Sequence, residues 1–164
     1  MESRAPSHPG PAFREDTMTL RPALLPSLVL AAMPAQPAFA DEFRLKPSGQ
    51  SFEDTTFALE SAILGQGLVI DYVSHVGEML ERTRADIGSD VVLFTNAEIY
   101  MFCSASLSRQ VMEADWQNVA FCPYGISVLE RPGEEVMVGY LHRSAETMAP
   151  VNDLLAEIVA EVTE

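Results

Sequence analysis

Two cysteines, Cys103 and Cys122, are the residues of this sequence best suited to chemistry. Cys103 follows an apolar run and precedes a serine-rich helix start, where the partial positive charge of a helix end would favour a thiolate. The separation of 19 differs from the CxxC spacing of redox enzymes, and two cysteines are too few for a structural zinc site. The pair therefore predicts a structural disulfide, two buried thiols or a reactive thiol pair.

His75 and Met79 lie four positions apart and could share one face of a helix. Together with a cysteine they would suit a soft metal or haem iron. Met79 also belongs to an apolar stripe at helical spacing, so we predict that it fills the core. Trp116 and Tyr124 could line a pocket beside the cysteines, although aromatic residues at the ends of elements usually serve packing. We assign no metal site, and the cofactor is left open.

No complete catalytic signature is present in the sequence. It lacks a GxSxG elbow, an HExxH helix and a phosphate loop, and Gly65-Gln-Gly67 lacks the third glycine of a dinucleotide fingerprint. Several acidic residues are predicted to form a solvated surface rather than an acid and base pair, since no flanking apolar structure would separate their pKa values. They are Glu78, Glu81, Asp86, Glu134 and Glu135. Whether the protein is an enzyme, and which residues would be catalytic, is left open.

Length and charge describe a single acidic domain. The chain has 164 residues, of which 48% are hydrophobic and 21% charged, enough for one hydrophobic core. Ten basic residues against 24 acidic ones give a formal net charge of -14. Because such a charge repels phosphate backbones and anionic lipid surfaces, nucleic-acid binding is disfavoured.

The first 40 residues are predicted to be a leader. Residues 1–17 are proline-rich and lack an apolar period, which is typical of a disordered extension or of a misassigned start codon. Residues 18–40 have a basic start, an apolar run and the Ala38-Phe39-Ala40 pattern of a secretory signal peptide. The apolar run is shorter than the roughly 20 residues of a membrane anchor. We expect cleavage before Asp41, a periplasmic or secreted protein, and no stable membrane anchor after cleavage.

Residues 41–164 are predicted to form one domain. Helical and alternating apolar spacings occur in the order β-α-β-α-β-α-β-β-α, which favours an α+β sandwich of two layers, with helices on one face of a mixed sheet. The expected strands are 42–46, 67–73, one interrupted strand or two short ones within 91–102, and a hairpin of 119–130 with 135–142 around a type II turn. The expected helices begin at a capping box on Ser51, after Ser74, at Ser104 or Ser106, and at Pro150.

Three segments carry a family likeness: His75 to Gly88, Phe102 to Arg109 and Phe121 to Val128. Together they resemble the domain of unknown function 302 family, and the resemblance spans about Phe52 to Arg143, with the helix after Thr147 at its edge. It implies a small α+β domain with helices packed on one curved, largely antiparallel sheet, and it transfers no catalytic residue. It also implies that the two cysteine-bearing strands are antiparallel neighbours, so that the cysteines lie close enough to bridge.

The sequence leaves three functional hypotheses. The first is an exported accessory domain of unknown activity that binds a small ligand or a partner protein near Cys103 and Cys122, with His75, Tyr124 and Trp116 as candidate ligand-binding residues. The second is a thiol-dependent redox or sulfur-handling protein in which Cys103 is the nucleophile and Cys122 resolves it. The third is a metal or haem carrier that uses His75 and a cysteine. The expected partner is a small ligand or a periplasmic protein, and a second copy of the chain is a further candidate.

Overall fold

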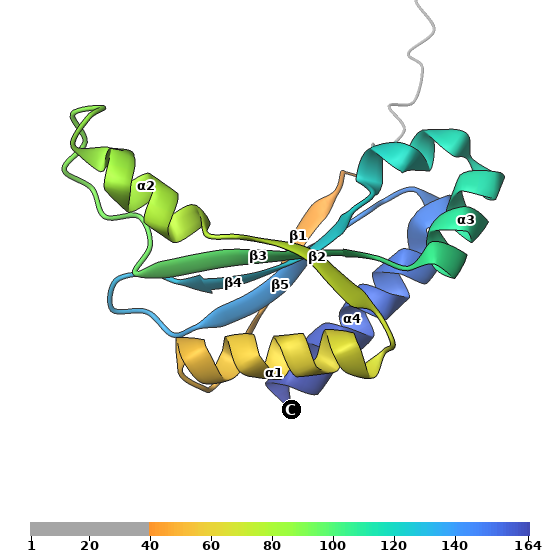
Figure 1. Ribbon diagram of the computed structural model, residues 1–164, viewed down its shortest axis with the longest axis horizontal. Coiled ribbons are helices and arrows are strands. Elements are labelled where there is room, and N and C mark those ends of the chain that lie inside the picture. The colour runs from red at the N-terminus through yellow and green to blue at the C-terminus, as the bar shows by residue number, and fades with distance from the viewer. Residues whose placement is uncertain (1–39) are drawn as a thin grey trace, which may run out of the picture. The chain divides into compact units, whose positions relative to one another are not determined.

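The structure is a computed structural model that describes residues 40–164. The predicted extension and signal peptide lie outside the described residues. Within them the elements follow the predicted order, with two short 3-10 helices added (Figure 1). No helix of this part of the chain is both long and apolar enough to cross a lipid bilayer.

Five strands form one open antiparallel sheet. They are β1 (Glu42–Pro47), β2 (Val69–Ser74), β3 (Asn96–Cys103), β4 (Tyr124–Glu130) and β5 (Met137–His142). The order across the sheet is β1-β5-β4-β3-β2, with every neighbouring pair antiparallel. The predicted hairpin joins β4 to β5 through a turn in which Gly133 has a φ of 77° and Glu134 N–H donates to Arg131 at 3.0 Å. A β-bulge at Asp71 interrupts the free edge strand β2. The α+β fold class is thus confirmed, and so is the largely antiparallel sheet that the family resemblance implies. The mixed sheet expected from the element order is wrong, because every pair is antiparallel.

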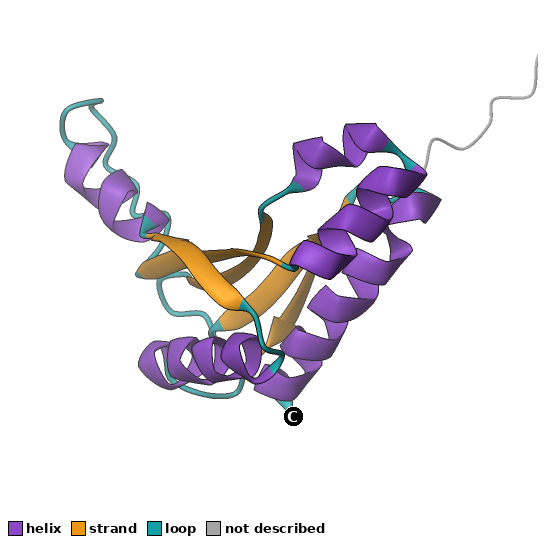
Figure 2. Ribbon diagram, turned by 45° about the vertical axis from the view of Figure 1, so that its right-hand side comes forward, coloured by secondary structure: helices purple, strands orange, loops and turns teal. Residues whose placement is uncertain are grey.

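Helices α1 (Phe52–Gly65) and α4 (Ala149–Thr163) pack on one face of the sheet, which confirms the predicted layers (Figures 1 and 2). Helix α1 begins where the capping box predicts, with Ser51 Oγ accepting from Asp54 N–H at 3.1 Å. Helix α3 (Ala105–Ala114) packs against α4 and the 3-10 helix that precedes it, and leads into the 3-10 helix η1 (Trp116–Phe121). A second 3-10 helix, η2 (Glu146–Met148), leads into α4.

The hydrophobic core lies between the sheet and these helices. Alternate residues of the three central strands point into it, and each large side chain removed from water contributes about 1.5 to 3 kcal/mol. The strand residues are Tyr100, Phe102, Ile126, Val128, Val138 and Tyr140, and the helix residues include Leu59, Ile63, Val151, Leu155, Ile158, Val159 and Val162. Asn152 of α4 is also buried. Its side-chain amide is satisfied there, since its oxygen accepts from Arg143 N–H at 2.9 Å and its nitrogen donates to Arg143 C=O at 2.8 Å.

Helix α2 (Val76–Arg84) does not pack as the apolar stripe predicts. Met79 is 42% exposed and Ile87, beyond the helix end, is 75% exposed, so the prediction that Met79 fills the core is wrong. The reason is geometric: α2 stands at one end of the strands and is buried only at Gly77, which packs on the backbone of Ala97.

Two strand predictions are also corrected. The apolar run Val91–Phe94 is a loop in which only Phe94 is half-buried and the other three side chains are exposed, and β3 starts after it at Asn96. Residues Val119–Phe121 belong to η1 rather than to a strand, because Asp115 caps that turn by accepting from Gln117 N–H at 3.0 Å. Strand β4 therefore begins at Tyr124, after Cys122 instead of before it.

Candidate functional site

Cys103 and Cys122 form a disulfide, with their Cα atoms 6.6 Å apart. Cys103 ends β3 and Cys122 follows η1, just ahead of β4, which pairs with β3 antiparallel. This is the arrangement that the family resemblance implies. The described residues include no free cysteine, so neither sulfur is a thiol in this state.

The two aromatic candidates, Tyr124 and Trp116, differ in burial. Tyr124 is 3% exposed, and its hydroxyl is bonded to Ser108 Oγ at 2.9 Å, so it is a packing residue of the core. Trp116 begins η1 and is 74% exposed. A cavity of about 510 Å³ does reach Cys103, and its polar lining residues are Gln66, Asp71, Ser104 and Ser106. The cysteine neighbourhood therefore offers one charged group and no aromatic side chain to a ligand.

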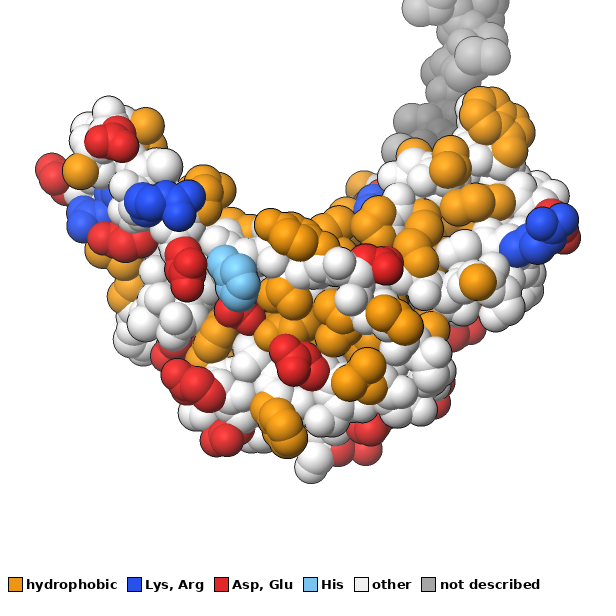
Figure 3. Space-filling model, viewed as in Figure 1, with side chains coloured by type: hydrophobic (Ala, Val, Ile, Leu, Met, Phe, Trp, Pro, Cys, Tyr) orange, Lys and Arg blue, Asp and Glu red, His pale blue; other side chains and the backbone are white. Residues whose placement is uncertain are grey.

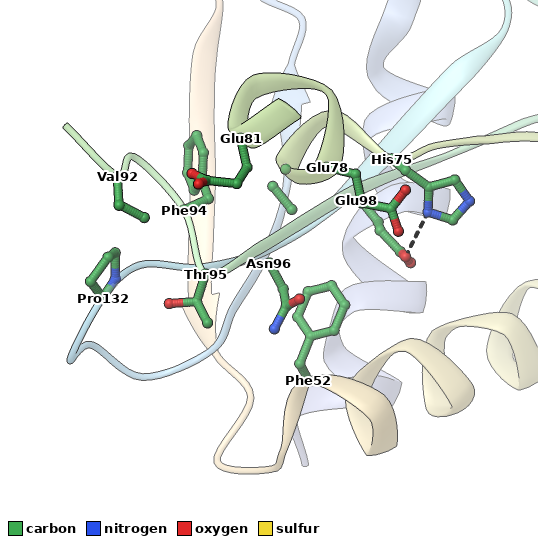
Figure 4. Close-up of a pocket in the computed structure, with 12 residues that line it drawn as sticks. Phe52, His75, Glu78, Glu81, Val92, Phe94, Thr95, Asn96, Glu98 and Pro132 are labelled. Atoms are coloured by element: carbon green, nitrogen blue, oxygen red, sulfur yellow. Dashed lines mark hydrogen bonds and ion pairs between the residues drawn. The ribbon is translucent and has the colours of Figure 1, made fainter. Parts of the chain in front are cut away.

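His75 lies toward the other end of β3, at a second cavity of about 510 Å³ (Figure 4). This cavity, called here the His75 cavity, is bounded by α2, the loop before β3, the start of β3, the first residue of α1 and the hairpin turn. Its lining residues are Phe52, His75, Gly77, Glu78, Glu81, Val92, Phe94, Thr95, Asn96, Ala97, Glu98 and Pro132. The lining contains three carboxylates and neither lysine nor arginine.

A chain of hydrogen bonds fixes one end of the His75 cavity. Tyr100 and Glu98 are alternate residues on one face of β3, and the hydroxyl of Tyr100 donates to Glu98 Oε2 at 2.7 Å. Glu98 Oε1 accepts from His75 Nδ1 at 2.8 Å, because the pairing of Ser74 with Ile99 sets His75 beside Glu98. Burial, together with the Glu98 carboxylate, raises the pKa of Tyr100 above its ordinary value. Tyr100 therefore stays a neutral donor that holds Glu98 in place.

The remaining carboxylates come from α2. In Figure 4, Glu78 and Glu81 extend from α2 on one side of the cavity, and the ring of Phe52 lies on the other. Glu81 is paired with Arg84, which donates to it at 2.9 Å, whereas Glu78 makes no ion pair among residues 40–164. The arrangement is a negatively charged cavity with aromatic and aliphatic walls.

Comparison with known proteins identifies the family but no activity. The family model described as "Domain of unknown function DUF302" matches residues 45–164. The chain belongs to the DUF302 family. A crystal structure of an uncharacterized conserved DUF302 protein from Bacillus stearothermophilus is similar to this DUF302 domain, with a TM-score of 0.61 at 17% identity, covering 73% of this chain and 97% of that one. At that identity the likeness shows the fold alone, and no curated protein matches the chain.

The family match extends further than the sequence resemblance indicates. It runs through the last residue, so α4 belongs to the DUF302 domain rather than to its edge. The five residues singled out from the sequence do not form one site: Cys103 and Cys122 meet in the bridge, Tyr124 is in the core, Trp116 is on the surface, and His75 is at the rim of the His75 cavity.

His75 and the cysteines are not arranged as the ligands of one metal ion or haem iron. Both cysteines are bridged, and Met79 is a surface residue of α2. The described residues contain no group of three or more His, Cys, Asp or Glu side chains arranged to hold a metal ion.

Sequence reasoning missed Glu98, Glu78 and Phe94 as site residues. It assigned Glu78 and Glu81 to a solvated surface and treated Glu98 as part of a break between strands. A signal for Glu98 was present, since it stands two positions before Tyr100, and alternate residues of a strand share a face. The position of Phe94 carried no such signal, because it follows from a loop.

Proposed function

We propose that this DUF302 domain is an exported binding protein for a small organic cation, and that the His75 cavity is its binding site. The observation that carries the proposal is the composition of the lining, which combines three carboxylates with the aromatic rings of Phe52 and Phe94 and has neither lysine nor arginine. A volume of about 510 Å³ lies within the range of small-molecule pockets, about 300 to 1,000 Å³.

Each group of the cavity has a role in this proposal. Glu78 provides the unpaired charge that attracts an ammonium group. The Glu98 carboxylate, held by Tyr100 and His75, is oriented before the ligand arrives, so little ordering entropy is lost on binding. Phe52 and Phe94 would cover the apolar body of the ligand and, where a ring faces the charge, add a cation–π attraction.

Calorimetric titration with benzylamine, benzyl alcohol and benzoate tests the charge preference, because the three probes share a ring and differ in charge. We expect benzylamine to bind most tightly, and Glu78→Gln to weaken it about tenfold, a change of about 1.4 kcal/mol. Glu113→Gln on α3 is the matched control, since Glu113 is an exposed glutamate outside the cavity and should leave the affinity unchanged. Equal affinity for all three probes would overturn the proposal.

Export is supported by the signal-peptide pattern of residues 18–40. Protein recovered from outside the inner membrane is expected to begin at or within two residues of Asp41. Terminal sequencing that finds the whole leader on that protein would contradict export by this signal.

The bridge between Cys103 and Cys122 favours a second candidate, a thiol-dependent redox or sulfur-handling role. Ser108 Oγ lies 3.8 Å from Cys122 Sγ and could donate to a thiolate there after reduction. The two candidates separate in one experiment: reduction followed by alkylation of Cys103 and Cys122 should abolish a thiol-disulfide activity, whereas benzylamine binding at the His75 cavity should persist.

A further inference from the structure

The face of the sheet opposite α1 and α4 is apolar and open. Its paired positions hold no charged residue in any of the five strands, and Asp71, in the bulge of β2, lines one cavity with Val69 and Cys103 of this face. Five of its large side chains are between 37% and 69% exposed: Phe43, Leu45, Val69, Tyr72 and Leu141. Between them lie Ile99, Met101, Leu129 and Met137, which are half-buried, and Gly125, Ser127 and Gly139. We call this set of residues the open face.

The open face continues onto the elements at both ends of the strands. At one end, Met79 of α2 and Tyr72 line one cavity, whose charged residues are Glu78 and Arg82. At the other end, Phe121 of η1 lines a small cavity with Gly125, Leu141 and Arg143. Figure 3 shows the resulting hollow, with hydrophobic side chains along it and on its α3 side. A contiguous apolar surface of this size on a soluble domain marks an interaction site.

The size of the open face meets the need of a protein interface. Five strands at about 4.8 Å spacing and about 20 Å length cover roughly 480 Å² per copy, or about 1,000 Å² when two copies meet. This is about the smallest area that a specific interface buries, and contacts to α2 and η1 would add to it. The composition, rich in aromatic residues and methionine and free of lysine and glutamate, is that of an interface core.

The shape of the hollow points to a second copy of the same chain as the occupant. Helices α2 and η1 rise at the two ends of the strands, while no described element stands beyond the free edges of β1 and β2 (Figure 1). A twisted sheet with helices rising at its strand ends has the shape of a saddle, raised along the strands and open across them. A half-turn about an axis in the sheet plane, at about 45° to the strands, places a second saddle face to face with the first so that the two surfaces fit. That rotation is a twofold axis, and it crosses the strands of the two sheets at about 90°, a known mode of sheet packing.

Charge supports the same choice. Two copies with a net charge of -14 each repel, so contact costs least through the face whose paired positions hold no carboxylate. The helices on the other face carry many of the acids, including Glu53, Asp54, Glu60, Asp153, Glu157 and Glu161. We propose that the open face is the interface of a twofold-symmetric homodimer in which the two sheets cross near 90° and each copy's strand-end helices enclose the free sheet edges of the other.

Sedimentation equilibrium on the purified protein over a dilution series tests this proposal. We expect a dimer mass, and because salt screens the repulsion between the two acidic copies, dimerisation should tighten as salt is added. Leu141→Glu should raise the dissociation constant by about 100-fold or more, since the twofold axis brings two unpaired charges into the interface. Phe57→Glu is the control, because Phe57 is 72% exposed on α1, on the helical side.

Tyr72→Glu gives a second, independent variant at a side chain that is 62% exposed, so its folding does not depend on core packing. Near-ultraviolet circular dichroism confirms that each variant is folded before its mass is measured. A parent protein that remains monomeric at every concentration would overturn the proposal. So would a dimer that both glutamate variants leave intact.

Discussion

The Cys103–Cys122 bridge makes the most direct prediction on stability. It closes a loop with a sequence separation of 19 that contains α3 and η1. For a loop of that length the chain-entropy relation gives a loss of about 11 cal/mol/K from the unfolded ensemble, or about 3 kcal/mol at 25 °C. With an m-value of about 1 to 3 kcal/mol/M, reduction should lower the urea midpoint by about 1 to 3 M.

The measurement compares three samples by circular dichroism in urea: the oxidised parent, the parent kept reduced, and the double variant Cys103→Ala with Cys122→Ala. The reduced parent retains every side-chain atom, so its loss isolates the loop closure. The double variant should lose slightly more, because two half-buried sulfur atoms are also removed. Equal midpoints for the oxidised and reduced parent would refute the reasoning, and a bridge absent from the folded protein by thiol labelling would remove its premise.

Three further predictions follow from the core, from Gly77 and from Tyr100. Removing residues 150–164 uncovers the sheet beneath α4 and costs about 1.5 to 3 kcal/mol for each large buried side chain of α4. The truncated chain should therefore show no cooperative urea transition. Deletion of Glu164 alone, the control, should leave the urea midpoint in place. Gly77→Ala would place a Cβ 2.7 Å from the backbone N of Ala97 and should lower the free energy of unfolding by about 1 to 3 kcal/mol. Gly65→Ala, which has open space around the added Cβ, should lower it by nothing. Equal melting temperatures for the two variants would contradict the close contact at Gly77. The pKa of Tyr100 is raised on folding, so the stability that this residue contributes is fully present below about pH 10 and is lost as the pH rises above that value. Tyr100→Phe should therefore flatten the fall in unfolding free energy between about pH 9 and about pH 11. An unchanged slope would argue against a raised Tyr100 pKa.

Local patterns sufficed for most elements of the fold. The capping box at Ser51, the turn at Gly133 and the apolar spacing from Val151 to Val162 each act within a few residues, and all three are present as predicted. The prediction that the apolar stripe of α2 fills the core was wrong, because periodicity shows that a helix has an apolar face but not what packs against that face. Met79 faces the hollow above the sheet instead of the core.

The candidate site was less accessible to sequence reasoning. The bridge followed from the antiparallel neighbours that the family resemblance implies. The His75 cavity did not, because its groups come from α1, α2, β3 and two loops, and only their arrangement in space makes three scattered glutamates one negative surface. Its central contact, from His75 to Glu98, depends on the register of β2 against β3, which the sequence pattern does not specify.

The two free edges of the sheet bear on how far association can proceed. An unpaired strand edge can recruit further strands and build an open-ended fibre. Here β1 ends in Lys46 and Pro47, a charge and a residue without an N–H donor, and β2 is broken by its bulge at Asp71. Both features disfavour edge-to-edge growth. The two short edge features thus counter amyloid-like polymerisation of a chain with a large apolar sheet surface, and the twofold contact proposed for the face of the sheet would close after two copies.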